Sequence, residues 1–196
     1  MFQVRIHGRG GQGVVTTAEL LSVAAFAEGR HAQAFPTFGS ERTGAPVVGF
    51  CRIDDQPIRT HEPVDRPDAV IIQDATLVHQ VDLFEGLATD GYLLVNTSYG
   101  LAELGLDAFV RRFDPDRVMT IPATELALMH LGRPLPGAVL LAAFAALTGQ
   151  VHLSSVLEAI KERFAEPVAT NNVAAAEDAY DRVRAQIKET ARAQAD

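Results

Sequence analysis

The chain has 196 residues, of which 47% are hydrophobic, so its length and composition fit one domain, residues 1–196, with a core that needs no covalent cross-links. Its formal net charge of −8, with Lys and Arg scattered along the sequence, argues against a nucleic-acid partner, because the surface would repel a phosphate backbone. The single cysteine, Cys51, excludes an intramolecular disulfide and cannot by itself hold an iron–sulfur cluster.

Neither an export signal nor a membrane span is predicted. Residues 1–8 show no basic leader followed by a long apolar stretch. The longest apolar run, residues 138–147, is far shorter than the roughly 20 residues that cross a bilayer, so it predicts a helix buried in protein. We therefore expect a cytoplasmic location, where a lone thiol stays reduced.

The amino-terminal third predicts a strand, a glycine loop and a helix, followed by two more strands. Residues 2–7 alternate apolar and polar side chains, and residues 14–29 carry apolar side chains at helical spacing. Two β-rich runs follow at 31–35 and 47–53, and the short segment 57–60 is a candidate hairpin partner.

The middle of the chain predicts parallel strands with a crossover helix. Residues 68–73 and 92–96 are β-rich apolar runs, and residues 117–121 form a further candidate strand that Pro122 ends. Between the first two runs, apolar residues recur at helical spacing, namely Leu77, Val78, Val81, Phe84 and Leu87. A short helix is expected from Thr124 to about Leu131.

The carboxyl-terminal third is predicted to be helical. The run 138–147 is apolar on every side, so it must be covered by the rest of the domain or by another subunit. Ser155 and Glu158 have the spacing of a capping box, and an Asn in the segment 170–172 is a candidate cap for the last helix. The element order predicts an α/β fold: three-layer α/β/α, with a mostly parallel mixed sheet, a Rossmann-like first βα unit and a helical carboxyl-terminal third.

The loop between the first strand and the first helix has the composition of an anion site. Gly8, Gly10 and Gly13 match G-x-G-x-x-G after a strand and before a helix, where that pattern has structural meaning. Backbone without Cβ atoms can approach a phosphate closely, and the helix N-terminus favours negative charge. The glycines either bind a phosphate or pyrophosphate group or only allow the helix to pack closely on the sheet.

Standard nucleotide sites fit this loop poorly. Val14 and Val15 stand where a P-loop needs Lys and Ser or Thr, so hydrolysis of ATP or GTP is not expected. A dinucleotide site needs an acidic residue after the second strand, but residues 31–35 end without one, and Glu28 falls at a helix end. NAD is therefore an unlikely ligand on sequence grounds.

An ordered set of motifs resembles a known family. The segments are the glycine loop Gly8 to Gly13, the polar loop Gly39 to Gly44, and the strand region 66–74. Later pieces at 91–98 and 121–132, and the apolar helix before residues 154–164, are also similar, so the resemblance spans almost the whole chain. Together they resemble the gamma subunit of the pyruvate:ferredoxin and related 2-oxoacid:acceptor oxidoreductases. One departure is Ala45, where many relatives have a second glycine.

The resemblance implies a subunit of a complex that oxidatively decarboxylates a 2-oxoacid to an acyl-coenzyme A and passes electrons to ferredoxin or a similar acceptor. Thiamine diphosphate, Mg²⁺ and the [4Fe-4S] clusters are expected on partner subunits, namely the thiamine-binding and ferredoxin-like chains. This chain is expected to bind no cofactor tightly, with no catalytic residue and no metal ligand, and to be inactive alone. Coenzyme A is the ligand expected at the glycine loop and the polar loop, which makes these the candidate site residues: Gly8, Arg9, Gly10, Gly11, Gln12, Gly13, Ser40, Glu41, Arg42, Thr43 and Gly44.

Two other functions stay open at this level: a free-standing nucleotide-dependent oxidoreductase and a pure scaffold subunit. Arg9 and Arg42 either contact coenzyme phosphates or lie in solvent or at a subunit rim. The six histidines lack metal-binding spacing, and Cys51, among alternating apolar neighbours on a strand, is expected to be a buried thiol without a redox role.

Overall fold

The sheet is mixed and mostly parallel. The structure is a computed structural model that describes residues 1–36 and 43–195, and in that part of the chain six strands form one sheet in the order β2-β3-β1-β4-β5-β6. Strands β1, β4, β5 and β6 run parallel, whereas β3 is antiparallel to both of its neighbours. The strands are β1 Phe2–Arg9, β2 His31–Pro36, β3 Pro46–Asp54, β4 Ala69–Ile72, β5 Tyr92–Asn96 and β6 Val118–Ile121. The predicted α/β class is confirmed.

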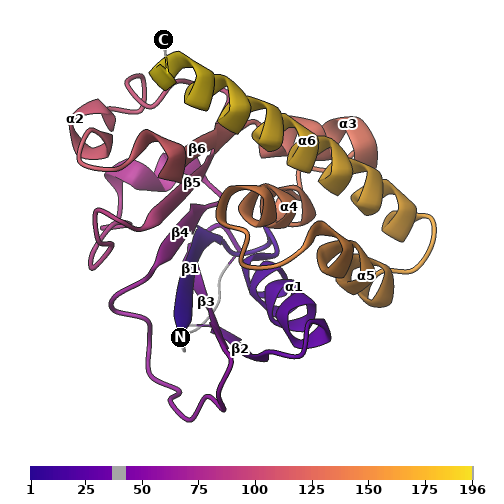
Figure 1. The fold of residues 1–196 in the computed structure, drawn as a ribbon. Helices are drawn as coiled ribbons and strands as arrows, with labels where there is room; N and C mark the ends of the chain where they lie inside the picture. Colours follow the sequence, from indigo (N-terminus) through magenta and orange to yellow (C-terminus); the bar gives the residue numbers. More distant parts are fainter. Residues whose placement is uncertain (37–42, 196) are drawn as a thin grey trace.

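The long helices all lie on one side of the sheet (Figure 1). They are α1 Val14–Ala27, α3 Ala123–Leu131, α4 Gly137–Thr148, α5 Leu153–Arg163 and α6 Val168–Ala195. Every residue of 138–147 is buried, because α4 packs between the sheet and α6 and meets α1 and α5. The chain itself therefore covers its most apolar helix. No helix in the described ranges has the length and apolarity to cross a bilayer.

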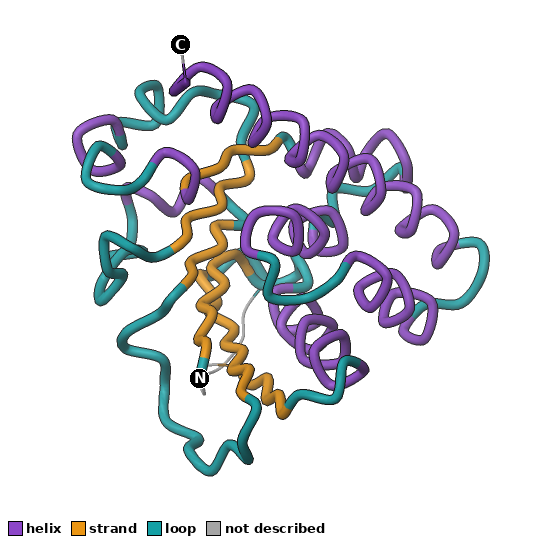
Figure 2. The backbone as a smooth tube through the Cα atoms, in the orientation of Figure 1, coloured by secondary structure: helices purple, strands orange, loops and turns teal. Residues whose placement is uncertain are grey.

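The opposite face of the sheet is covered by short turns and loops (Figure 2). The elements there are the 3-10 turn η1 Ala75–His79 and the one-turn helix α2 Asp107–Val110, whereas the 3-10 turn η2 Pro115–Arg117 contacts α4 and α6. The predicted helix across Leu77 to Leu87 is wrong. The Asp82 carboxylate accepts the Phe84 N–H, and Gly86 has φ 74° with the Asp65 carbonyl only 1.8 Å from where a Cβ would stand. Leu77, Leu83 and Leu87 still bury against the sheet, but from loops.

Two buried arginines fix the loop where a hairpin partner was predicted. Residues 57–60 form no strand, so that prediction is wrong. Arg52 donates to the carbonyls of Glu62 and Pro63, and Arg5 donates to those of Val64, Leu83 and Glu85. Burial lowers the pKa of both guanidinium groups. Arginine side chains of the sheet, not a strand partner, thus bond the carbonyls of residues 62–64 in this loop, and Arg5 also bonds the segment between β4 and β5.

Both predicted caps in the carboxyl-terminal third are wrong, because each helix begins before the residue that was predicted to cap it. Helix α5 begins at Leu153, after His152, whose N–H donates to the Glu28 carboxylate over 2.7 Å. Burial alone would raise the pKa of Glu28, but hydrogen bonds from His152 and Ser155 lower it. Helix α6 begins at Val168, and Asn172 lies inside it, donating to the Val168 carbonyl.

Cys51 is buried as predicted. Its side chain is 0% exposed on β3 between Phe50 and Arg52, and burial raises the pKa of the thiol. Its sulfur therefore stays protonated and out of reach of solvent.

Candidate functional site

The glycine loop turns from the end of β1 into α1, and its glycines serve different purposes. A Cβ on Gly8 would lie 2.5 Å from Val14 Cγ2, so Gly8 allows the helix to pack against the strand. Gly11 and Gly13 have φ of 93° and 77°, a backbone region that side-chain-bearing residues rarely adopt. Position 8 therefore needs glycine for close packing, and positions 11 and 13 favour glycine because of their positive φ.

The end of the predicted polar loop lies directly against the glycine loop. Gly10 N–H donates to the Ala45 carbonyl over 2.9 Å, and the Gly10 carbonyl accepts the Gly44 N–H over 3.0 Å. Gly10 and Thr43 form an isolated parallel bridge. The sequence-predicted residues Gly8 to Gly13, Thr43 and Gly44 therefore come together, whereas Ser40, Glu41 and Arg42 lie outside the described residues.

The first turn of α1 leaves backbone donors open. Gly13 is the N-cap and has no capping side chain, and the first turn contains no acidic residue. The Gly13 carbonyl accepts the Thr17 N–H, and no described residue accepts from the N–H groups of residues 14–16. These groups, with the helix dipole, favour an anion.

A cavity of about 400 Å³ adjoins this helix start. Its walls are mainly apolar, Arg133 supplies a positive charge, and no acidic residue lines it. The first residues of α4 also lie on it, packed so closely to α1 that a Cβ on Gly137 would stand 2.5 Å from Thr17 Oγ1. The lining residues are Gln12, Gly13, Thr16, Thr17, Leu20, Leu131, Arg133, Leu135, Gly137, Ala138, Phe164, Val168, Asn171 and Asn172.

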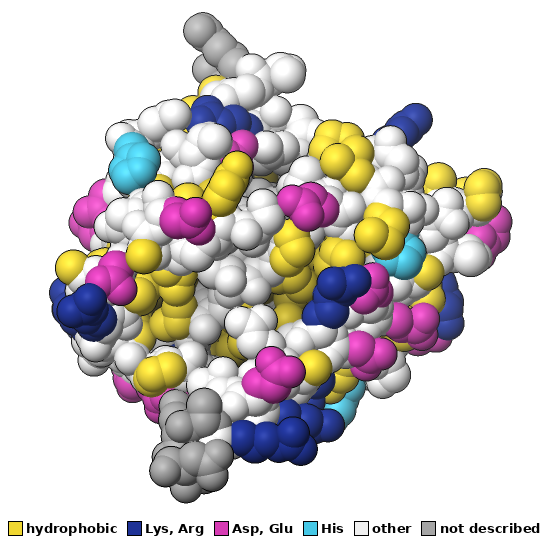
Figure 3. Space-filling view, turned by 90° about the horizontal axis from the view of Figure 1, so that it is seen from above, with side chains coloured by type: hydrophobic (Ala, Val, Ile, Leu, Met, Phe, Trp, Pro, Cys, Tyr) yellow, Lys and Arg dark blue, Asp and Glu magenta, His cyan; other side chains and the backbone are white. Residues whose placement is uncertain are grey.

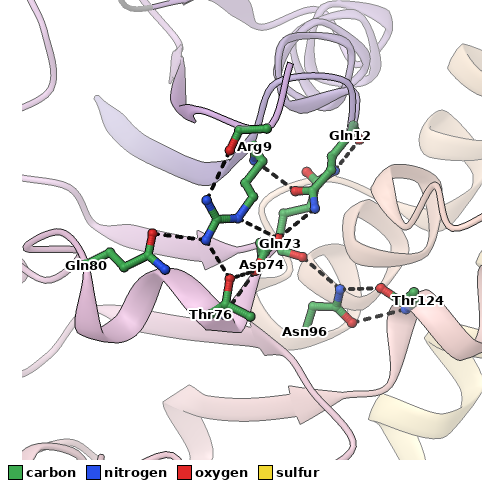
Figure 4. A network of polar contacts seen from close by, with 9 residues as sticks. Arg9, Gln12, Gln73, Asp74, Thr76, Gln80, Asn96 and Thr124 are labelled. Atoms are coloured by element: carbon green, nitrogen blue, oxygen red, sulfur yellow. Dashed lines mark hydrogen bonds and ion pairs between the residues drawn. The ribbon is translucent and has the colours of Figure 1, made fainter. Parts of the chain in front are cut away.

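On the other side of the loop, a polar network ties it to the end of β4 (Figure 4). Asp74 accepts the Gln12 amide over 2.7 Å and forms an ion pair with Arg9 over 3.2 Å. Arg9 also donates to Gly44 O, Thr76 Oγ1 and Gln80 Oε1. Arg9 is thus held by internal partners, and a coenzyme phosphate would have to share it with them.

The pKa of Asp74 is lowered. Burial alone would raise it, but hydrogen bonds from Thr76 and Gln12 and the nearby Arg9 charge outweigh burial. The carboxylate is therefore ionised at neutral pH and accepts from all of these donors.

Amide side chains continue the network along the carboxyl ends of the parallel strands. Gln73 donates to the Gln12 carbonyl, Asn96 donates to the Gln73 carbonyl over 2.8 Å, and Asn96 also bonds Thr124 at the start of α3. These residues follow or end β4, β5 and β6. Such strand ends are where open α/β sheets bind ligands.

Sequence analysis missed most of this network. Asp74, Gln73, Asn96 and Thr124 were not predicted as site residues, and neither was Arg133 in the first cavity. Their position in the sequence could have indicated them, because Gln73, Asp74 and Asn96 each stand at or just after the end of a buried parallel strand. A second cleft of about 740 Å³ opens here, and its lining includes Asp74, Glu103 and Glu125.

Other predicted features can be placed as well. Glu28, the nearest match to a dinucleotide-site acid, is engaged by His152. Among residues 1–36 and 43–195, no group of three or more His, Cys, Asp or Glu is placed to hold a metal ion.

Comparison with known proteins agrees with the predicted resemblance. The family model for pyruvate ferredoxin/flavodoxin oxidoreductase matches residues 3–182. The chain belongs to this family. A pyruvate synthase subunit PorC from Methanothermobacter marburgensis is 45% identical over 184 residues, which cover 94% of this chain and 98% of that protein.

Two further family members extend the match. The common gamma subunit of the pyruvate/ketoisovalerate oxidoreductases from Thermococcus kodakarensis is 44% identical over 182 residues, covering 93% of this chain and 97% of that one. The crystal structure of pyruvate oxidoreductase subunit PORC from Thermotoga maritima superposes with a TM-score of 0.76 at 36% identity, covering 92% and 95% of the two chains. The predicted gamma-subunit family is confirmed, and with it the subunit role in an oxidoreductase complex.

Proposed function

We propose that this gamma-type subunit supplies part of the coenzyme A site of a 2-oxoacid oxidoreductase complex and carries no reactive group of its own. The observation that carries the proposal is the open first turn of α1, which faces an acid-free cavity with Arg133 on its wall. A phosphate of the coenzyme fits the amides of residues 14–16, and the apolar wall fits the uncharged part of the molecule.

The residues of this chain also indicate that the cofactors of the complex are bound by partner chains. One buried cysteine cannot ligate a cluster, so the [4Fe-4S] centres belong to a ferredoxin-like partner, and thiamine diphosphate with Mg²⁺ belongs to a thiamine-binding partner. In the overall reaction, the 2-oxoacid anion and coenzyme A give acyl-coenzyme A, carbon dioxide and a proton, and an electron pair passes to the acceptor. We further propose a cytoplasmic location.

Holding the coenzyme is itself a catalytic contribution. Fixing the thiol carrier near the thiamine site converts a bimolecular encounter into an intramolecular one, which removes part of the entropic barrier. The groups that do this here are backbone N–H donors, which are fixed before the coenzyme arrives and need no reorganisation.

Exposed apolar side chains are consistent with partner chains covering this subunit. Phe26 is 72% exposed on α1, and Met129 is 70% exposed on α3. Figure 3 shows hydrophobic side chains exposed within a hollowed face of the molecule. Such groups on an isolated surface favour burial against another protein.

The test is steady-state kinetics of the assembled complex carrying Gly13→Ala. A Cβ on Gly13 meets no atom within 4 Å, so the change acts on the φ of 77° at the helix start. Forcing an L-residue into this region costs about 1–2 kcal/mol, so the KM for coenzyme A should rise roughly 5- to 30-fold while the KM for the 2-oxoacid stays constant. Arg133→Gln should raise the same KM by a smaller factor.

The matched control is Gly149→Ala. Gly149 has φ 64° and equally free space, but it lies at the far end of α4 from the cavity. An unchanged coenzyme KM in Gly13→Ala, or an equal rise in Gly149→Ala, overturns the coenzyme site and favours a pure scaffold. Turnover by the isolated chain with a 2-oxoacid, coenzyme A and a viologen dye, or its tight binding of NADH, would instead favour a free-standing enzyme.

A further inference from the structure

The glycine loop does not hold its own shape. Gly11 and Gly13 restrict φ less than other residues do, and α1 lacks a side-chain cap. Beside the backbone bonds of Gly10 to Gly44 and Ala45, the side-chain contacts that fix the loop come from the end of β4, which lies beside β1 because His7 pairs with Ile72 in the parallel register.

Asp74 is the centre of those contacts. One carboxylate oxygen accepts the Gln12 amide over 2.7 Å and lies 3.2 Å from Arg9 Nε. The other accepts the N–H and hydroxyl of Thr76. The side chain of Asp74 is only 14% exposed, so these partners are largely shielded from competing water.

A carboxylate at this position sets the direction of the Gln12 amide. Because ionised Asp74 can only accept, Gln12 must present its NH₂ group to it, and Gln12 Oε1 then accepts the Arg9 N–H over 2.8 Å. Gln73 meanwhile donates to the Gln12 carbonyl. Gln12 is therefore held by both its side chain and its backbone, and the next residue is the helix cap Gly13.

We propose that Asp74 is a positioning residue for the coenzyme-binding loop, acting through Gln12 and Arg9 to hold the left-handed turn that aims the first amides of α1 at the anion. This inference depends on the proposed function, since it assigns to Asp74 the shape of a loop whose ligand is coenzyme A. Asp74 does not line the cavity beside α1, so it acts without touching the coenzyme there.

The experiment compares Asp74→Asn with Asp114→Asn in the assembled complex. Asp114 caps η2 by accepting the Asp116 N–H, as Asp74 caps η1 by accepting the Thr76 N–H, so both variants keep a capping oxygen and lose only the negative charge of the same kind of local cap. Asp74→Asn should raise the KM for coenzyme A about tenfold and leave kcat and the KM for the 2-oxoacid within twofold. Asp114→Asn should leave all three unchanged.

Two further measurements separate positioning from a loss of structure. Combining Asp74→Asn with Gln12→Met should raise the coenzyme KM no more than the larger single change, because both act through one contact.

Hydrogen exchange reports on the loop without any turnover. In the full chain, backbone amides of residues 10–16 should exchange faster in Asp74→Asn than in wild type, and those of α4 should not change. Equal coenzyme KM values in Asp74→Asn and wild type, with Gly13→Ala still impaired, overturn the positioning proposal alone. If Gly13→Ala is also unimpaired, the coenzyme site itself is refuted.

Discussion

Replacing Gly8 by Ala tests the packing of the first βα unit. The added Cβ would lie 2.5 Å from Val14 Cγ2 and 3.2 Å from Gln73 Cβ. Carbon atoms pack best at about 3.5–4.0 Å, so the start of α1 must move by roughly 1 Å. Overpacking of this kind costs about 1–3 kcal/mol, which for a chain of this length lowers the melting temperature by about 2–4 °C per kcal/mol.

Thermal unfolding of the full chain measures this effect, and Gly100→Ala is the control. Gly100 has no positive φ, and its nearest contact is the flexible Glu103 carboxylate at 3.4 Å, so this variant should stay within about 0.5 kcal/mol of wild type. Adding Val14→Ala to Gly8→Ala removes the clashing methyl and should recover part of the loss. Equal stability of Gly8→Ala and Gly100→Ala would refute the packing argument.

Two further stability predictions follow from buried groups. Burial, and to a smaller extent the Arg5 charge, lower the pKa of His7 to about 4 in the folded chain. As pH falls from about 6.5 toward 4, His7 is therefore protonated in the unfolded chain but still neutral in the folded chain, which favours unfolding. Urea unfolding should therefore show about 2 kcal/mol less stability at pH 5 than at pH 7.5, and His7→Gln should flatten this dependence. Phe144→Ala removes a ring that is 1% exposed in α4 and should cost about 3–5 kcal/mol by the same assay, and a cost under about 1 kcal/mol would contradict the packing of α4.

Some elements could be predicted from their own sequence alone, because the pattern and length of their apolar runs determine whether they form a strand or a helix. The strands at 92–96 and 118–121 and the buried helix over 138–147 follow from apolar runs of the right length. The segment 77–87 shows the limit of this reasoning. Its apolar residues have helical spacing, and Leu77 and Leu87 are buried, but the Asp82 turn and Gly86 divert the backbone before a second helical turn forms.

The α5 cap and the site residues were mispredicted for a different reason, which is that their partners are distant in sequence. The carboxylate that accepts the His152 N–H belongs to Glu28, 124 residues away, so a local capping box could not reveal where α5 begins. Asp74 contacts Gln12 across 62 residues, through a strand pairing that no single segment encodes. Local patterns found the glycine loop, but only the assembled sheet shows what holds it.

The glycine motif alone does not say on which side of the loop a ligand lies, but the charges around it do. Gln12 lines both the cavity beside α1 and the cleft at the strand ends. The cleft contains Asp74, Glu103 and Glu125, whose carboxylates repel an anion, whereas the cavity contains Arg133 and the open amides of residues 14–16. Like charge disfavours a phosphate and helix N-termini favour one, so the α1 side is the side that we propose for the anionic coenzyme. Gln12 forms the wall between the two hollows.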